Sequence, residues 1–162
     1  MTKREKIRCA LMALAVIAVV ALDQFTKYLV VQNIRLGGDL PFIPGFIGFT
    51  YVQNTGAAFS ILNTHTWMLA VLSGAASVLI GVALARKALP HWSGMLALSL
   101  LLGGAVGNLI DRAFFGFVTD MFATTFMNFA VFNVADIGVT LGAVLLLLHV
   151  IFFYNRGKEG TK

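Results

Sequence analysis

Long apolar stretches dominate the chain, and shorter segments rich in glycine, proline and charge separate them. Four stretches are long enough to cross a membrane, because a hydrocarbon core about 30 Å thick needs about 20 residues of helix. Backbone N–H and C=O groups in lipid must be paired within their own segment, so each stretch is predicted to be a helix. The predicted spans cover residues 7–31, 67–85, 92–110 and 132–153.

The overall composition is that of a membrane protein. Hydrophobic residues make up 59% of the chain and charged residues 12%, whereas soluble domains carry about 25% charged residues. We expect residues 1–162 to form a single integral membrane domain. The basic start of the chain is also typical of a cleaved signal peptide. We reject that alternative because the first apolar run continues to Val31 and further spans follow.

Lysine and arginine gather at both chain ends and in the short connection between the second and third spans. With an even number of spans these three segments share one side of the membrane, and the positive-inside rule makes that side the cytoplasm. We therefore expect both termini in the cytoplasm and the connections 32–66 and 111–131 on the outer face. The net charge of +5 then reflects topology, and we expect no nucleic-acid partner.

The first outer connection carries turn and strand signals. Glycine and proline punctuate residues 36–48, and residues 46–52 are aromatic and β-branched. We predict a small β-rich subdomain at about 33–65, and we expect the Phe-rich stretch 114–132 to form a mobile cover. The predicted fold class is an all-α membrane protein, a four-transmembrane-helix bundle with a small extracytoplasmic β-rich subdomain.

Four aspartates fall within or beside the apolar segments, all toward the predicted outer face. An ionisable residue at membrane depth costs about 2.5–3.5 kcal/mol on insertion scales. Four such residues on a short chain therefore indicate one polar, functional site at the outer boundary of the membrane. The four are Asp23, Asp111, Asp120 and Asp136.

Two of these aspartates have basic neighbours that offer a structural explanation. Asp23 and Lys27 are spaced to share one helix face and to pair. Asp111 and Arg112 end the third span beside Asn108, and these three side chains could neutralise one another or position a substrate.

Asp120 and Asp136 have no basic residue close by in the sequence, so a structural role explains neither of them well. One continuous helix would hold them about 24 Å apart at ~1.5 Å per residue, so they can meet only if the chain turns between them. Residues 123–128 allow that turn, and Asn133 could cap the fourth span. Two carboxylates in one site share a proton, so one can activate water while the other protonates a carbonyl, as in aspartic peptidases.

Other chemistries find little support in the sequence. His65, His91 and His149 are far apart, and Cys9 is the only cysteine, so we expect no metal and no cofactor. Nucleotide-binding P-loops and GxSxG serine motifs are absent. Two alternatives stay open: an ion-coupled transporter with access from both faces, and a structural protein, which would leave the two isolated aspartates unexplained.

Five short motifs follow one another along the chain: residues 23–27 (DQFTK), 54–59 (NTGAAF), 107–112 (GNLIDR), 118–120 (VTD) and 132–136 (FNVAD). Each motif alone is weak, but together and in this order they resemble bacterial lipoprotein signal peptidase, also called signal peptidase II. The resemblance covers nearly the whole chain.

The resemblance implies an aspartic endopeptidase of the bacterial cytoplasmic (inner) membrane. It would remove the signal peptide from diacylglyceryl-modified prolipoproteins, cleaving just before the lipidated cysteine. Its partners would be these prolipoproteins and membrane lipid, and we expect it to be a monomer. The implied catalytic residues are Asp120 and Asp136. The implied substrate-binding or site-supporting residues are Asn54, Gly56, Asn108, Arg112, Asn133, Asp23, Lys27 and Asp111.

Overall fold

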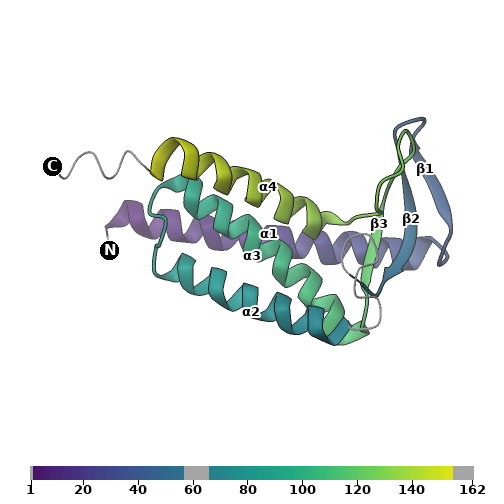
Figure 1. Ribbon diagram of the computed structural model, residues 1–162, viewed down its shortest axis with the longest axis horizontal. Coiled ribbons are helices and arrows are strands. Elements are labelled where there is room, and N and C mark those ends of the chain that lie inside the picture. Colours follow the sequence, from purple (N-terminus) through teal and green to yellow (C-terminus); the bar gives the residue numbers. More distant parts are fainter. Residues whose placement is uncertain (1, 57–65, 155–162) are drawn as a thin grey trace.

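The computed structural model describes residues 2–56 and 66–154, in which four long helices lie side by side and a small sheet lies across one end of them (Figure 1). All four helices are long and apolar enough to cross a membrane, which confirms the four predicted spans. The helices are α1 (Lys3–Asn33), α2 (Thr66–Ala85), α3 (Trp92–Phe115) and α4 (Val134–His149), which continues as a short π-helix, η2 (Val150–Tyr154).

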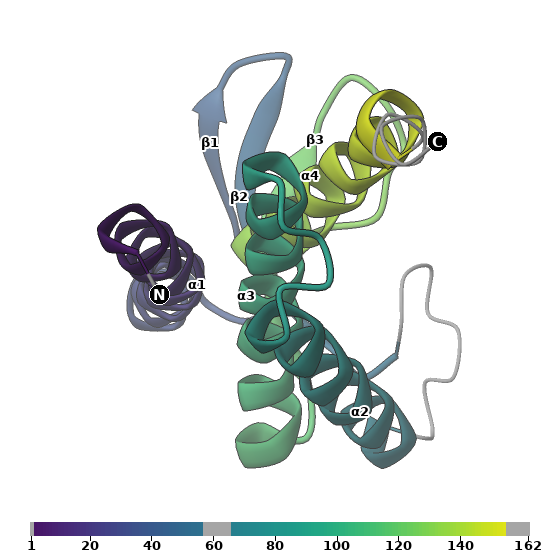
Figure 2. The same ribbon diagram turned by 90° about the vertical axis from the view of Figure 1, so that its left-hand side faces the viewer.

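Helix α3 is the central helix and packs against α1, α2 and α4 (Figure 2). Glycine allows this close packing. A Cβ atom at Gly103 would lie only 2.8 Å from the Cβ of Val19 in α1, and one at Gly107 would lie 3.1 Å from the Cβ of Ala135 in α4. Small residues of this kind let helix backbones approach one another in membranes. The C-terminal half of α3 is thereby held close to both α1 and α4.

Capping residues extend two helices beyond the predicted hydrophobic spans. Helix α1 begins at Lys3 because Thr2 and Glu5 form a reciprocal capping box. Helix α3 continues to Phe115 and ends at Gly116, whose φ of 77° is the left-handed conformation that glycine adopts readily. Asp111 and Arg112 therefore belong to the last turns of α3 and not to the connection that follows it.

The sheet contains β1 (Asp39–Ile43), β2 (Ile47–Asn54) and β3 (Val118–Thr124), in the order β1-β2-β3 with antiparallel pairing. Strands β1 and β2 lie within the predicted β-rich segment. The Phe-rich stretch expected to act as a cover begins by completing α3 and then forms β3. The sheet is therefore built from both outer connections.

After β3 the chain reverses direction and returns alongside the strand. Phe132 pairs with Phe122 through backbone hydrogen bonds of 2.8 and 3.2 Å. This reversal confirms the predicted turn and brings the start of α4 beside β3. A cluster of Val30, Tyr51 and Met121 packs the sheet against the C-terminal end of α1.

Candidate active site

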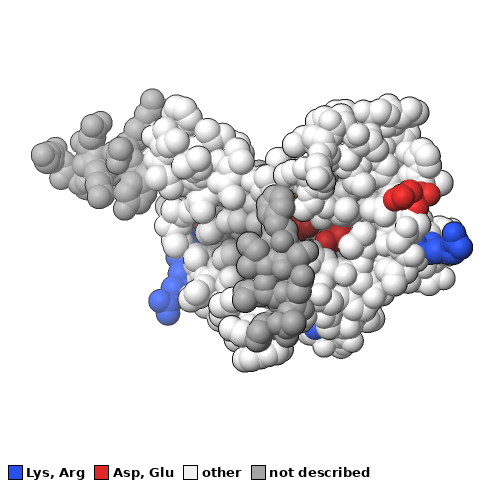
Figure 3. Space-filling model, turned by 45° about the vertical axis from the view of Figure 1, so that its right-hand side comes forward, with Lys and Arg blue, Asp and Glu red and all other residues white. Residues whose placement is uncertain are grey.

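A cavity of about 490 Å³ lies where α3, α4 and the sheet meet. Its polar lining comes from all three elements, and its apolar lining comes from Val118, residues 129–132 and α4. Figure 3 shows acidic atoms within a hollow near the middle of the surface, apart from the charged residues that lie nearer its edges. The polar residues that line the cavity are Asn54, Asn108, Arg112, Asp120, Asp136 and Thr140.

Asn133 joins the two aspartates that the sequence singled out. Its Nδ2 atom donates to Oδ1 of Asp120 at 2.6 Å, and its backbone N–H donates to Oδ2 of Asp136 at 3.1 Å. Its own Oδ1 accepts from the backbone N–H of Asp136 at 2.9 Å, which completes a capping box at the start of α4. The predicted cap is confirmed, and the same residue brings the two carboxylates into one site.

Two further asparagines hold the remaining carboxylate oxygens. Asn54 in β2 donates to Oδ2 of Asp120 at 2.9 Å, and Asn108 in α3 donates to Oδ1 of Asp136 at 2.8 Å. Asn133 also donates to Oδ1 of Asn108 at 3.1 Å. Each of the four carboxylate oxygens therefore accepts a hydrogen bond from an amide, and both carboxyl groups have fixed orientations.

Asp120 is only 2% exposed, and no ion pair among the described residues reaches it or Asp136. Burial, opposed in part by the hydrogen bond from Asn54, raises the pKa of Asp120 to about 6, and the negative charge of Asp136 adds to the rise. Burial and a nearby like charge both disfavour the ionised form of a carboxyl group. Asp120 therefore binds a proton more readily than an ordinary carboxyl group does, which suits a proton-sharing pair.

A buried ion-pair network lies directly behind this site. The Nζ atom of Lys27 contacts Oδ2 of Asp23 at 2.7 Å and Oδ2 of Asp111 at 3.1 Å, and it donates to Oδ1 of Asn108 at 3.2 Å. The pairing of Asp23 with Lys27 is confirmed. The three N–H groups of the ammonium match these three oxygen acceptors, so its charge is fully satisfied although the side chain is buried.

Asp23 and Asp111, the two carboxylates of this ion-pair network, also hold the backbone next to each candidate catalytic residue. Asp23 accepts a hydrogen bond from the N–H of Ala135 at 2.8 Å, in the first turn of α4. Asp111 accepts one from the N–H of Thr119 at 2.9 Å, in β3. Ala135 precedes Asp136, and Thr119 precedes Asp120. The network therefore fixes both sides of the site from behind.

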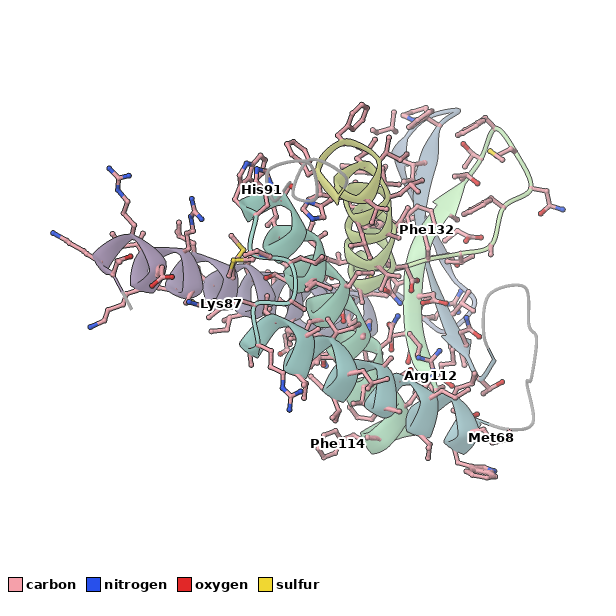
Figure 4. The ribbon with its side chains drawn as sticks, turned by 60° about the vertical axis from the view of Figure 1, so that its left-hand side comes forward. Met68, Lys87, His91, Arg112, Phe114 and Phe132 are labelled. Atoms are coloured by element: carbon pink, nitrogen blue, oxygen red, sulfur yellow. The ribbon has the colours of Figure 1, made fainter. Side chains whose placement is uncertain are left out.

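Among the described residues Asp111 pairs with Lys27 and forms no ion pair with Arg112. Consecutive residues of a helix point in different directions, and Asp111 turns toward α1 while Arg112 turns toward the sheet, as Figure 4 shows for Arg112. Its Nη2 atom donates to the carbonyl of Gly56 at 3.3 Å. Its Nε atom is buried without a hydrogen-bond partner in the described part of the chain.

The sequence reasoning missed Gln24 as a member of the site. Its Nε2 atom lies 3.2 Å from Oδ2 of Asp23, 3.0 Å from Oδ1 of Asp111 and 3.2 Å from the carbonyl oxygen of Gly107. The side chain thereby links α1 to α3 beside Lys27. A polar amide inside an apolar span was the available signal, since such groups hydrogen-bond between helices.

Histidine residues that are far apart in the sequence come together at the opposite end of the bundle. Ser93 Oγ lies 2.7 Å from Nδ1 of His91 and 2.9 Å from Nδ1 of His149, and Figure 4 shows His91 far from Arg112. His65 lies outside the described residues. Among the residues that are described, no group of three or more His, Cys, Asp or Glu side chains could hold a metal ion.

Four apolar spanning helices and a pair of amide-held aspartates in a common cavity define an integral membrane protein with the site of an aspartic peptidase. The model of the Signal peptidase (SPase) II family matches residues 15–152. The chain belongs to the signal peptidase II family, and the resemblance read from the motifs is confirmed. Membership makes the chain an aspartic peptidase and removes the transporter and structural-protein alternatives.

Relatives and solved structures agree with this assignment. The chain is 43% identical to a lipoprotein signal peptidase of Enterococcus faecalis, over 87% of this chain and 88% of the relative. It is 45% identical to one of Streptococcus pyogenes, over 85% and 91%. Two solved structures of bacterial membrane enzymes are also similar. One has a TM-score of 0.84 and 28% identity over 94% of this chain and 92% of the other, and the second has a TM-score of 0.81 and 29% identity over 89% and 94%.

Proposed function

We propose that this enzyme removes the signal peptide from diacylglyceryl-modified prolipoproteins and cleaves just before the lipidated cysteine. Asp120 and Asp136 are the catalytic pair. The observation that carries the proposal is the set of four amide hydrogen bonds that orient both carboxyl groups toward a shared cavity. Relatives named lipoprotein signal peptidases, at more than two-fifths identity, support the choice of substrate.

In the proposed mechanism Asp136 acts as general base and Asp120 as general acid, since Asp120 retains its proton up to a pH of about 6. Asp136 takes a proton from water as the water oxygen bonds to the scissile carbonyl carbon, and Asp120 protonates the carbonyl oxygen. The resulting gem-diol then collapses. The C–N bond breaks, the leaving nitrogen takes the proton from Asp136, and a hydroxyl of the gem-diol returns a proton to Asp120.

The lining of the cavity suits a substrate that arrives from the bilayer. Ile137 and Leu141 are exposed on α4 and line the cavity below the two aspartates, so an apolar signal helix can reach the site sideways through lipid. The free Nε of Arg112 can donate to a backbone carbonyl of the bound peptide. Asn54 places its side-chain amide at the same rim. Its Oδ1 accepts a hydrogen bond from the backbone N–H of Gly56 at 2.9 Å.

The proposal includes an orientation and an assembly state. Both termini lie in the cytoplasm, the site faces the extracytoplasmic side, and residues 1–162 act as one domain and as a monomer in the inner membrane. The distribution of charge supports this orientation. At the end of the bundle away from the sheet, the start of α1 and the connection between α2 and α3 carry the basic residues Lys3, Arg4, Lys6, Arg8, Arg86 and Lys87.

The substrate assignment can be tested with purified protein in lipid nanodiscs. A prolipoprotein carrying the diacylglyceryl group and the same chain without it are incubated in parallel, and mass spectrometry locates the cut. We expect cleavage of the lipidated chain alone, immediately before the modified cysteine. Equal cleavage of both chains, or a cut elsewhere, would contradict the proposal.

A further inference from the structure

Thr140 lines the active-site cavity one helical turn below Asp136. The two residues lie at i and i+4 on α4 and share one face of the helix, about 6 Å apart along its axis at ~1.5 Å per residue. The side chains next to Thr140 on this wall are Ile137, Val139 and Leu141. A single hydroxyl therefore stands in the otherwise apolar part of the cavity wall that α4 supplies.

The hydroxyl of Thr140 has no hydrogen-bond partner among the described residues. Serine and threonine inside helices commonly donate to the carbonyl four residues earlier. Thr26, Ser77 and Ser99 do so, at 2.9, 2.7 and 2.9 Å. Thr140 is not paired in this way, although a free hydroxyl in apolar surroundings is costly. It is therefore available to a group that enters the cavity.

The substrate supplies such a group. A signal helix must unwind around the bond to be cut, and the unwound backbone exposes N–H and C=O groups that lipid cannot satisfy. An extended peptide advances about 3.3 Å per residue. Two residues of extended substrate therefore span roughly the same distance as that from Asp136 to Thr140.

We infer that Thr140 is a substrate-positioning residue whose hydroxyl hydrogen-bonds the unwound signal-peptide backbone about two residues before the scissile bond. This inference rests on the proposed function, since it assumes that a signal peptide occupies the cavity. The apolar neighbours of Thr140 receive the side chains of that segment, and the hydroxyl pairs one backbone group that would otherwise be buried alone. The interaction holds the peptide in register with the two aspartates.

Two substitutions at Thr140 distinguish the contribution of the hydroxyl to substrate binding from the contribution of side-chain packing. Thr140→Val deletes the hydroxyl and keeps the side-chain volume, whereas Thr140→Ser keeps the hydroxyl. Ser73→Ala is the matched control, because Ser73 also donates no hydrogen bond among the described residues but lies on α2 outside the cavity. We expect Thr140→Val to raise KM about five- to tenfold with kcat within about twofold, the usual loss for one neutral hydrogen bond. Thr140→Ser and Ser73→Ala should match the wild type.

A substrate with one backbone amide replaced by an ester identifies the partner. Ester replacement two residues before the scissile bond should raise KM severalfold for the wild type but add little for Thr140→Val, because the interaction is already lost. Equal ester effects in both proteins, or wild-type kinetics for Thr140→Val, would overturn the inference. Thermal unfolding of each variant checks that it is folded. Failure of the wild type to cleave any prolipoprotein would instead contradict the proposed function itself.

Discussion

Asn133 both starts helix α4 and holds the two proposed catalytic carboxyl groups. Its side-chain oxygen caps the helix, its side-chain nitrogen binds Asp120, and its backbone N–H binds Asp136. A cap is set by local sequence, whereas the contact with Asp120 depends on the chain reversal between Phe122 and Phe132. The residue therefore couples correct local folding of α4 to assembly of the site.

Two substitutions separate these roles of Asn133. Asn133→Ala removes the cap and the contact with Asp120, so it should lower stability by about 1 kcal/mol and cleavage by tenfold or more. Asn133→Ser can cap the helix but is too short to reach Asp120, so it should restore stability without restoring cleavage. Thermal unfolding and the prolipoprotein assay measure the two effects. Wild-type cleavage by Asn133→Ser would show that the contact with Asp120 is dispensable.

Burial of Asp120 should make stability depend on pH. Its pKa is raised from 3.8 to about 6, so the folded protein holds this proton more tightly than the unfolded chain does. The contribution of this proton to the free energy of unfolding is fully present below pH 3.8. About 3 kcal/mol of it is lost as the pH rises through 6. Asp120→Asn removes this dependence. We expect the variant to gain thermal stability over the wild type between pH 4 and 7, and a constant difference across that range would contradict the expected rise.

The sequence predicted local pairs of residues better than pairs that join different elements. Asp23 and Lys27 lie on one helix, so their spacing alone defines their contact. The partner of Asp111 is Lys27 on another helix, and no spacing within α3 indicates it. Charge counting suggested Arg112 instead, because neighbours in sequence were the only candidates that the sequence placed close together.

At the scale of whole elements, the site depends on how closely α4 approaches α3. A Cβ atom at Gly104 would overlap the carbonyl oxygen of Ala135 and lie 2.7 Å from Cγ2 of Val139. Both neighbours belong to α4, within one turn of Asp136. The position of the proposed catalytic residue is therefore set by a glycine on the facing helix.

Gly104→Ala should push α4 away and misplace Asp136. Because the closest contact is a backbone atom, the strain cannot be relieved by rotating a side chain, and displacements near 1 Å can cost about a hundredfold in rate. Gly81→Ala is the control, since a Cβ at Gly81 on α2 has no atom within 4 Å. We expect cleavage to fall at least tenfold in the first variant and to stay unchanged in the second. Equal rates would show that the approach of α4 does not position the site.

Hydrophobicity predicted the four spans because a membrane requires long apolar helices, but it did not predict strand β3. The first four residues of β3 are all buried, so they lack the alternation that marks a strand with one exposed face. Pairing with β2 also depends on the folding of the whole outer region. The sequence alone marked Asp120 as unusual, but it did not predict that Asp120 lies in a strand.

The molecule as a whole separates a basic end from the end that holds the proposed catalytic pair. The sheet and the paired aspartates lie at one end of the bundle, and the His91–Ser93–His149 cluster lies at the other (Figures 1 and 4). This polarity follows from the even number of spans and the clustering of lysine and arginine. In the proposed orientation, this polarity would place cleavage where the extracytoplasmic end of a signal peptide leaves the membrane.

Cysteine labelling in intact cells tests the proposed orientation. With Cys9 replaced by serine, a cysteine is introduced either at Pro44 in the β1–β2 turn or at Ala88 between α2 and α3, both exposed positions. A membrane-impermeant thiol reagent should label Pro44→Cys in intact cells and Ala88→Cys only after lysis. The reverse pattern would contradict the proposed topology.

The most direct test of the central claim compares the wild type with Asp120→Asn and Asp136→Asn on one lipidated prolipoprotein, followed by the gel shift of the mature product. Asparagine keeps the size of each side chain but can neither accept the proton from water nor donate one to the carbonyl. We expect each substitution to lower cleavage by a factor of about a hundred or more in protein that stays folded. Wild-type cleavage by either folded variant would contradict catalysis by the aspartate pair.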